Sequence, residues 1–271
     1  AAPAGAARPP RSAAEATAFC PPELAAGDSR QALDESIRAA EAEAAERLLA
    51  AAAAGETGDV RRLLARLSPD CVAKSGRHEG LTPLMAAAAR GRADAAALLL
   101  ERKASLEARD PRGWTALMHA VQEQRPALLQ QLLAAKAAAH VAAEADGGVT
   151  ALMLAANGAR TELCSLLLKA GAKKEASDAE GRRALHYAAK KGHGGALVAL
   201  LAARARVNDP DSGGLSPMLL AAAAGRAESV KILLSSRADQ TAKDPEGRSA
   251  ADLAGIYEHE RVLAALAEAG G

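Results

Sequence analysis

The sequence predicts an all-α fold of the solenoid type, in which helix-turn-helix units stack side by side and β-hairpin-like loops join them. A four-residue motif begins at residues 82, 115, 150, 183, 216 and 249, at intervals of 33 or 35 residues. A glycine stands two residues before each copy. Hydrophobic residues make up 49% of the chain and aromatic residues only 1%, so we expect a core of closely packed alanine and leucine helices.

The repeated motif marks the start of a helix. Thr82 and Ser216 are good N-cap residues, and a proline follows each of them at the first helical position, where a missing N–H costs nothing. The six copies are Thr82-Pro83-Leu84-Met85, Thr115-Ala116-Leu117-Met118, Thr150-Ala151-Leu152-Met153, Arg183-Ala184-Leu185-His186, Ser216-Pro217-Met218-Leu219 and Ser249-Ala250-Ala251-Asp252. A first helix is therefore predicted in each unit.

A second helix is predicted in each unit after a glycine. Gly91, Gly192 and Gly225 stand nine residues after the start of the motif and end the first helix. The segments that follow carry runs of leucine, which are Leu98-Leu99-Leu100, Leu166-Leu167-Leu168, Leu200-Leu201 and Leu233-Leu234. Each unit therefore consists of a turn, a helix, a second turn and a second helix.

The loops between units carry the pattern Asp-x-x-Gly. Aspartate favours the first position of a tight turn, and glycine favours the last. Pro111 and Pro245 take the second position of two of these turns, where the fixed φ of proline fits a type I turn without strain. The turns are expected to form hairpin tips, and they begin at Asp110, Asp178, Asp211 and Asp244.

The combination of this start motif, paired alanines, a mid-repeat glycine, a leucine pair and an Asp-x-x-Gly loop resembles the ankyrin repeat. The resemblance covers roughly residues 50–269 and implies an ankyrin-repeat domain over residues 46–271. Within it we expect an N-terminal cap over about 46–76, repeats that start near 77, 110, 145, 178 and 211, and a C-terminal cap over about 244–271. Helices with more polar residues are expected in that last cap, because the end of a solenoid would otherwise expose its core.

Two departures from the ankyrin pattern lead to structural predictions. The family places a left-handed glycine after the second helix, and only Gly171 matches it. A residue with a side chain costs about 1 kcal/mol in that conformation. The equivalent positions elsewhere hold Lys103, Lys136, Arg204 and Arg237. The segment from residue 136 to 148 is also two residues longer than its counterparts, so we expect its hairpin to be displaced.

The N-terminal 45 residues precede the repeats. Residues 1–27 are rich in alanine and proline and lack periodicity, so we expect them to be disordered. Residues 28–45 are predicted to form an amphipathic helix, because Asp28 and Gln31 have capping-box spacing and apolar residues line one face. That face consists of Leu33, Ile37, Ala40, Ala44 and Leu48, and it either packs on the first repeat or forms a short dimerising coil.

Charge and cysteine content argue against several classes of protein. The 34 basic and 33 acidic residues leave a net charge of +1, and aromatic stacking residues are nearly absent, so no binding of nucleic acid is expected. Cys20, Cys71 and Cys164 lack the spacing of a disulfide framework or a zinc site, which favours a reducing compartment. The sequence shows neither an apolar run long enough to span a bilayer nor a secretory signal. We therefore expect an intracellular protein of the cytoplasm or nucleus that does not insert into membranes.

No catalytic residue, cofactor or metal ion is predicted. The sequence signatures of serine hydrolases, P-loop proteins, protein kinases and zinc proteases are absent. The ankyrin resemblance implies that His186 forms a hydrogen bond between adjacent loops, with His119 one position past the equivalent site. It implies similar structural roles for His193 and His259. Cys164 lies among leucines and is expected to be a small buried apolar residue.

The resemblance implies that the hairpin tips and first helices line a concave surface that binds other proteins. Trp114, the only tryptophan, is the predicted anchor, because Trp and Arg are enriched in binding hot spots. Alternatively, Trp114 folds back onto the neighbouring hairpin. The residues that stand just before each motif are Leu81, Trp114, Val149, Arg182, Leu215 and Arg248, and the first three are expected to form an exposed apolar stripe.

Four residues near the ends of first helices complete the predicted surface, together with Arg112 on the Trp114 hairpin. They are Gln122, Glu123, Lys190 and Lys191. With Arg182, the two lysines are expected to make the middle of the groove basic, so that it binds an acidic segment; the alternative is an ordinary solvated face.

The sequence thus predicts a non-catalytic, monomeric scaffold or adaptor that binds other proteins. One alternative is the regulatory or targeting portion of a larger enzyme, channel or ubiquitin-ligase assembly. Residue 1 is alanine rather than methionine, which is compatible with a processed chain or a piece of a longer protein. A second alternative, an independent hydrolase or metalloprotein, predicts an activity that is lost when His186 or Cys164 is changed.

Overall fold

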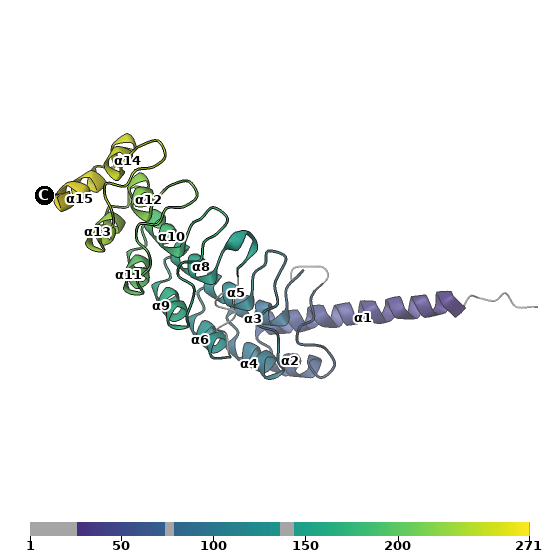
Figure 1. The fold of residues 1–271 in the computed structure, drawn as a ribbon. Helices are drawn as coiled ribbons and strands as arrows, with labels where there is room; N and C mark the ends of the chain where they lie inside the picture. Colours follow the sequence, from purple (N-terminus) through teal and green to yellow (C-terminus); the bar gives the residue numbers. More distant parts are fainter. Residues whose placement is uncertain (1–25, 74–78, 136–143, 271) are drawn as a thin grey trace, which may run out of the picture. The chain divides into compact units, whose positions relative to one another are not determined.

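A computed structural model describes residues 26–73, 79–135 and 144–270 (Figure 1). The chain divides into two units, residues 1–41 and residues 42–271, and the boundary falls inside the first helix. The segment predicted to be disordered, 1–27, lies outside the described residues except for Ala26 and Gly27, which are helical.

Helix α1 runs from Ala26 to Ala54, so it is longer at both ends than the predicted helix 28–45. Residues 50–54 are all alanine, the strongest helix former, and they extend the helix until Gly55 takes a positive φ of 83°. The predicted boundary at residue 46 between helix and cap therefore falls within one continuous helix.

The side chains on the predicted apolar face of α1 are exposed in the first unit and buried in the second. In the first unit, Leu33 and Ile37 are exposed. In the second unit, Leu48 and Ala52 are buried in the core together with Val60 of α2 (Thr57–Leu63). Only the C-terminal end of this face is therefore part of the core.

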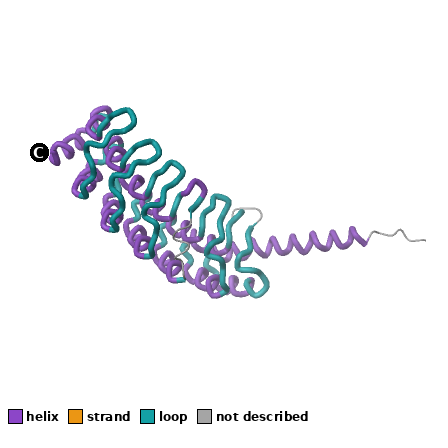
Figure 2. The backbone as a smooth tube through the Cα atoms, in the orientation of Figure 1, coloured by secondary structure: helices purple, strands orange, loops and turns teal. Residues whose placement is uncertain are grey.

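In residues 42–271 the helices form pairs that stack side by side, with the first helices in one row and the second helices in another (Figure 1). The long loops between pairs project together from the row of first helices (Figure 2). The first helices are α3 (Pro83–Arg90), α5 (Ala116–Gln122), α8 (Ala151–Asn157), α10 (Ala184–Lys191), α12 (Pro217–Ala223) and α14 (Ala250–Ile256). The second helices are α4 (Ala93–Glu101), α6 (Pro126–Ala134), α9 (Thr161–Lys169), α11 (Gly194–Ala202), α13 (Ala227–Ser235) and α15 (Glu260–Gly270).

The all-α solenoid prediction is confirmed. Across the described parts of the chain the hairpin loops contain isolated bridges, such as that between Glu144 and Thr150, and no longer strand. A short 3-10 helix, η2 (Asp146–Gly148), lies at one hairpin tip. None of the helices in these parts combines the length and the apolar composition needed to span a bilayer.

The predicted helix starts are confirmed by their capping bonds. The Thr82 hydroxyl accepts a hydrogen bond from the N–H of Met85 at 3.3 Å, and Ser216 accepts one from Leu219 at 3.3 Å. Thr115, Thr150 and Ser249 cap α5, α8 and α14 in the same way. These bonds satisfy N–H groups that would otherwise have no partner at the start of each helix.

The turn inside each repeat is left-handed even where glycine is absent. Gly91, Gly192 and Gly225 have the positive φ that glycine favours, as the sequence predicts. The equivalent positions in the other repeats hold Gln124, Ala159 and Glu258, with φ between 53° and 59°. These three residues retain the turn at a conformational cost.

The residue after this turn reaches back to the preceding repeat. Arg92 donates to the carbonyl of Ala53 at 3.1 Å, and Arg226 donates to the carbonyl of Lys190 at 3.3 Å. His193 makes the same kind of contact with the Asn157 carbonyl. Long polar side chains thus cap the first helix of one repeat from the next repeat.

The left-handed conformation predicted after the second helix is confirmed. Lys103, Arg204 and Arg237 have φ of 62°, 60° and 62°, and Gly171 has φ of 87°. Lys136, the remaining position, lies outside the described residues. Three side chains therefore occupy a conformation that a glycine would adopt without strain.

The hairpin that was expected to be displaced keeps the common geometry. The N–H of Ala145 donates to the Val149 carbonyl at 2.8 Å, just as the N–H of Asp110 donates to the Trp114 carbonyl at 3.0 Å. Gly148 closes the turn onto Ala145 at 2.9 Å. The displacement prediction is wrong for the described residues of this hairpin.

Backbone hydrogen bonds link neighbouring hairpins in the middle of the stack. The N–H of Ser212 donates to the Glu180 carbonyl at 2.9 Å, and equivalent bonds start from Ala179 and Asp146. Pro245 takes this position in the last hairpin and has no N–H. Its ring lies so close to Gly214 that a Cβ there would come within 2.8 Å of it, which explains the glycine.

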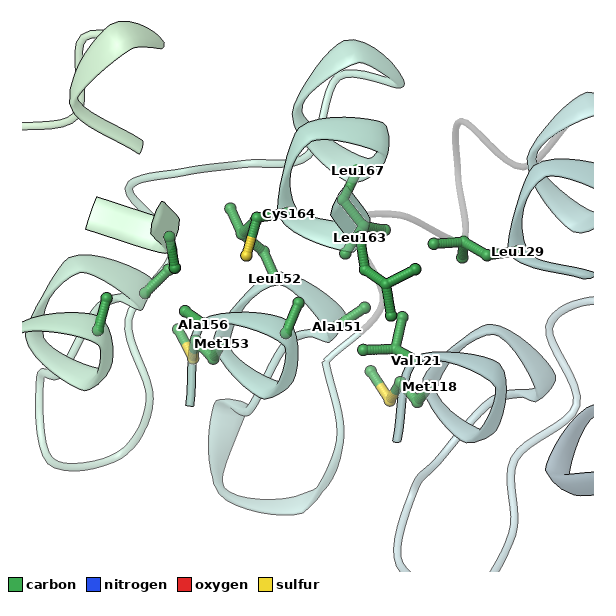
Figure 3. Close-up of a cluster of buried hydrophobic side chains, with 14 of the residues drawn as sticks. Met118, Val121, Leu129, Ala151, Leu152, Met153, Ala156, Leu163, Cys164 and Leu167 are labelled. Carbon is green, nitrogen blue, oxygen red and sulfur yellow. The ribbon is translucent and has the colours of Figure 1, made fainter. Parts of the chain in front are cut away.

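The core between the helix rows consists of leucine, alanine and methionine, as the composition predicts. Figure 3 shows Leu163 and Leu167 of α9 above Leu152 and Met153 of α8, with Met118 of the preceding repeat alongside. All five side chains are buried. Because each repeat contributes the same core positions, one hydrophobic interior runs through the stacked pairs.

Candidate functional site

A groove lies between two hairpins and the first helices in the middle of the stack. It is an open cavity of about 710 Å³. Its walls come from the ends of α8 and α10, from Leu220 of α12, and from the hairpins that begin at Asp178 and Asp211. Four predicted binding residues line it, namely Arg182, Lys190, Lys191 and Leu215. The fold therefore brings these four together from two repeats.

Four of the described hairpins are built around an aspartate that closes the turn, whereas Ala145 takes this position in the hairpin at residues 145–149. Oδ1 of Asp178 accepts the N–H groups of Glu180 at 3.1 Å and Arg182 at 2.8 Å. The same pair of bonds recurs at Asp110, Asp211 and Asp244. These bonds hold the residue that follows the turn in the same place in the four hairpins.

In the hairpin at Asp178, side chains occupy the second carboxylate oxygen. Oδ2 accepts from the Tyr187 hydroxyl at 2.5 Å and from Nε of Arg182 at 3.0 Å. The guanidinium also pairs with Glu180 at 2.7 Å and lies 5.0 Å from the centroid of the Tyr187 ring. Arg182 therefore does not supply the free positive charge that the sequence predicts, because its own hairpin neutralises it.

This cluster also shifts the pKa values of its acidic groups. Burial of the Asp178 carboxylate works to raise its pKa, but the bonds from Tyr187 and Arg182 outweigh it, so the pKa lies below the usual value. Burial and the bond to Asp178 both raise the pKa of Tyr187. The carboxylate is thus ionised and the phenol neutral at pH 7.

The Trp114 hairpin forms a similar cluster. Oδ2 of Asp110 lies 3.2 Å from Nε2 of His119 and 3.3 Å from Nη2 of Arg112. The Arg112 guanidinium lies 4.3 Å from the centroid of the Trp114 ring, and the His119 ring centroid lies 5.5 Å from it. Trp114 thus contacts residues of its own repeat and is half-buried rather than a freely exposed anchor.

The protonation state of this second cluster follows from its burial. Burial lowers the pKa of His119, and this effect outweighs the attraction of the Asp110 charge. The ring is therefore neutral at pH 7, with Nε2–H donating to the carboxylate. Burial works to raise the pKa of Asp110, yet the N–H groups of Trp114 and Arg112 hold it below its usual value.

The predicted exposed apolar stripe is contradicted by the structure. Leu81, Trp114 and Val149 are all half-buried, as is Leu215, and they pack against the hydrophobic core. The residue that precedes each of these first helices therefore packs on the core and does not project from the loop.

The free charge of the groove comes from two lysines at the end of α10. Lys190 and Lys191 are exposed. Over the described ranges, neither ammonium group has a hydrogen-bond or ion-pair partner. At the equivalent positions of α5, Gln122 and Glu123 are also exposed, but they do not line this cavity.

The last predicted binding residue, Arg248, is bonded within its own hairpin. Its guanidinium pairs with Asp244 at 2.7 Å and with Glu246 at 2.9 Å. Seven of the eleven predicted binding residues lie away from the cavity lining, and these are Leu81, Arg112, Trp114, Gln122, Glu123, Val149 and Arg248.

Nine of the thirteen residues that line the groove were not predicted as binding residues, and Asn157 and Tyr187 are two of them. Asn157 stands 33 residues before Lys190, and Tyr187 stands 33 residues before Leu220, and all four line the cavity. The repeat period was therefore the signal that could have found them. The bond from Tyr187 of α10 to Asp178 of the preceding hairpin joins residues nine positions apart, the same spacing as that between His119 and Asp110.

The histidines and the buried cysteine have structural environments. Nδ1 of His186 accepts the N–H of Arg183 at 3.1 Å, which caps its own helix, and the ring also interacts with the backbone of Asp209 in the loop that follows α11. Nε2 of His259 lies 3.2 Å from the Ala223 carbonyl of the preceding repeat. Burial raises the pKa of Cys164 to about 11. Among the residues with described positions, no group of His, Cys, Asp and Glu could hold a metal ion.

These features define the class of protein: a repeat solenoid with a polar groove on its hairpin side. The sequence pattern of three consecutive ankyrin repeats matches residues 48–143 and 126–211, and that of a single ankyrin repeat matches residues 213–245. The chain belongs to the ankyrin repeat family, whose repeats mediate interactions between proteins.

A stretch of 124 residues is 39% identical to the probable E3 ubiquitin-protein ligase XBOS33 of Oryza sativa subsp. japonica. The match covers 45% of this chain and 23% of the rice protein. The chain therefore corresponds to less than a quarter of that relative.

Proposed function

We propose that the protein is a non-catalytic adaptor that binds an acidic segment of a partner protein in the groove beside α10. The observation that carries the proposal is the pair of unpartnered lysines, Lys190 and Lys191. The other charged side chains that line the groove make hydrogen bonds of their own: Arg182 to Glu180, and Asp211 to backbone N–H groups. A carboxylate of the partner would therefore find both ammonium groups available.

The rigidity of the groove walls favours binding of such a segment. The aspartates of the turns and the backbone bonds between hairpins fix its walls, so binding costs little ordering on this side. Unpaired charges at a groove speed encounter with a partner of opposite charge and select against like charge. The identity of the partner would then depend on residues that differ between repeats, such as Asn157 and Lys190.

A non-catalytic role is supported by the state of the groups that could do chemistry. The Cys164 thiol, with its pKa raised to about 11, is protonated at pH 7 and buried. His119 and His186 are buried, and burial lowers the pKa of both rings. We place the protein in the cytoplasm or nucleus as a monomer without cofactor, in keeping with its near-neutral charge and free cysteines.

The match to a probable ubiquitin ligase favours a second candidate function. In that case the repeats are the targeting portion of a larger polypeptide and select its substrate through the same groove. Mass spectrometry of the endogenous protein, purified by antibody, separates the two. Peptides from an additional domain and ubiquitin transfer by the purified protein support the second function, whereas a polypeptide without either supports the first.

A photo-crosslinking experiment tests the groove as the binding site. The photoreactive residue p-benzoyl-phenylalanine replaces the exposed Ser212 of the groove, which leaves both lysines in place, or, as the control, the exposed Val198 of α11 on the second-helix side. We expect discrete adducts with cellular proteins from position 212 only. Adducts from position 198 alone, or the same adducts from both, contradict the proposal.

A further inference from the structure

We propose that the groove continues from the lysine pair to an apolar end at Ile256 and Tyr257, and that its ligand is a segment of about six residues with an acidic side chain at one end and a large apolar side chain at the other. This inference rests on the proposed function and specifies the chemistry of the partner segment. It starts from an observation that the sequence reading missed.

Ile256 and Tyr257 occupy the same positions of the repeat as the lysine pair. They follow Lys190 and Lys191 by 66 residues, which is two periods of 33. Asn157 and Lys190, one period apart, both line the groove at this position. The end of α14 therefore extends the row of side chains formed by the ends of α8, α10 and α12.

Both side chains are exposed although they are large and apolar. Ile256 is 58% exposed and Tyr257 is 55% exposed. The core side of α14 is already filled by Leu253 and Ala254, so the stability of the cap does not require an apolar pair at its end. The equivalent positions of α5 and α10 hold polar pairs, Gln122 and Glu123 in the first and Lys190 and Lys191 in the second. Exposed apolar groups that packing does not explain mark contact sites.

The intervening repeat leaves the path between the two pairs open. Its equivalent residues are Ala223 and Ala224 at the end of α12, the smallest side chains that a helix end commonly has. Tyr257 is supported by His259, whose ring stacks with it at a centroid distance of 6.1 Å. His259 is in turn held to the Ala223 carbonyl. The aromatic ring is therefore positioned before any ligand binds.

The spacing sets the length of the segment. Neighbouring helices pack about 8–10 Å apart, so two repeats separate the pairs by roughly 20 Å. An extended chain rises about 3.3 Å per residue, so about six residues cover that distance. Charge complementarity decides the acidic end, because the lysine pair lacks an internal partner.

One acidic residue opposes this ligand and sharpens the test. Asp211 lines the groove and uses Oδ1 to accept the N–H groups of Gly213 and Leu215. An asparagine would keep those bonds and remove the negative charge. Asp211→Asn is therefore expected to strengthen binding of the acidic segment by about threefold.

The experiment selects random 12-residue peptides, displayed on phage, against the full chain. Synthetic copies of the enriched peptides are then titrated by fluorescence anisotropy. We expect enrichment of Asp or Glu about six residues from Leu, Phe or Trp. Ile256→Ser/Tyr257→Ser should weaken binding about tenfold, as loss of a hot-spot pair does. Val198→Ser, which removes an equally exposed apolar group on the other side, should leave it unchanged.

The outcomes separate this inference from the proposed function. Peptide binding that Lys190→Glu/Lys191→Glu abolishes but Ile256→Ser/Tyr257→Ser leaves unchanged overturns the inference alone. Binding that is insensitive to the lysine variant, or no enriched peptide, overturns both. Circular dichroism of each variant confirms that a change in binding is not a loss of fold.

Discussion

The hairpin side and the second-helix side of the stack are held together differently. On the hairpin side, buried carboxylates such as Asp110 and Asp178 collect hydrogen bonds from backbone, His119 or Tyr187, and the arginine of their own loop. On the second-helix side, leucines are buried and side chains such as Arg204 occupy left-handed turns. The stability of the hairpin side therefore depends on the geometry of buried polar contacts. The stability of the second-helix side depends on apolar packing, which tolerates strained backbone at the turns.

This difference shows which side chains are available to a partner. Trp114, Arg182 and Arg248 have the residue types of binding hot spots, but each is engaged within its own hairpin. Lys190 and Lys191 have no such role in the fold. The comparison therefore predicts that substitutions in the hairpin clusters change stability, whereas substitutions of the lysines change binding.

The largest effect is expected at Asp178. Asp178→Ala removes the acceptor of four hydrogen bonds. The Tyr187 hydroxyl and Nε of the Arg182 guanidinium then lose the carboxylate oxygen to which they donate. We expect a loss of about 3 kcal/mol in the free energy of unfolding, measured by chemical denaturation. Glu180→Ala, in the same hairpin but exposed, is the control and should cost less than about 0.5 kcal/mol. Equal losses would mean that the buried cluster is not the source of stability.

A pH-dependent effect distinguishes the two hairpin clusters. The folded pKa of His119 is lowered, so the unfolded chain takes up the proton first as the pH falls. The stability from neutral His119 is complete above its ordinary pKa of about 6.5 and is lost between that value and the lower folded pKa, at up to about 1.4 kcal/mol per pH unit. His119→Tyr copies the Tyr187 cluster, which has no group that titrates in this range.

The measurement compares unfolding free energies at pH 7.5 and pH 5.0. We expect His119→Tyr to lose less stability on acidification than the parent chain, because His186, whose pKa burial also lowers, contributes the same loss in both proteins. An identical loss in the two proteins would show that His119 does not titrate with a lowered pKa.

A smaller effect, a gain in stability, is expected from a buried hydroxyl of α13. Ser229 is completely buried and its hydroxyl has no hydrogen-bond partner. The residue 33 positions earlier, at the equivalent place in α11, is Ala196, which is also completely buried. Ser229→Ala should therefore raise the free energy of unfolding by about 1 kcal/mol. Ser235→Ala on the exposed side of the same helix should not raise it.

The smallest effect is expected at Arg204. Its φ of 60° is strained for a residue with a Cβ, so Arg204→Gly should raise the free energy of unfolding by up to about 1 kcal/mol and increase the melting temperature. Arg204→Ala is the control, because it removes the long side chain but keeps the Cβ. If both variants have the same melting temperature, strain in the backbone is not the cause.

The sequence predicts the backbone of the repeats better than the contacts of their side chains. The capping role of Thr82 and the left-handed turn at Arg204 follow from position in the repeat, because local geometry imposes them. The environment of Trp114 does not follow from its position in the repeat. The tryptophan ring contacts a histidine and an arginine that come together only when the hairpin folds. The exposure of Ile256 likewise depends on which side of α14 the core occupies.

The lysine pair is tested most directly by quantitative capture of partners from a cell lysate. The parent chain is compared with Lys190→Glu/Lys191→Glu and with Lys169→Glu/Lys173→Glu, which makes the same change in charge at exposed lysines of the α9 region. After circular dichroism confirms the fold of all three, we expect a set of partners that only the α10 variant loses. Equal losses from both variants, or identical partner sets for all three, would contradict the groove as the binding site.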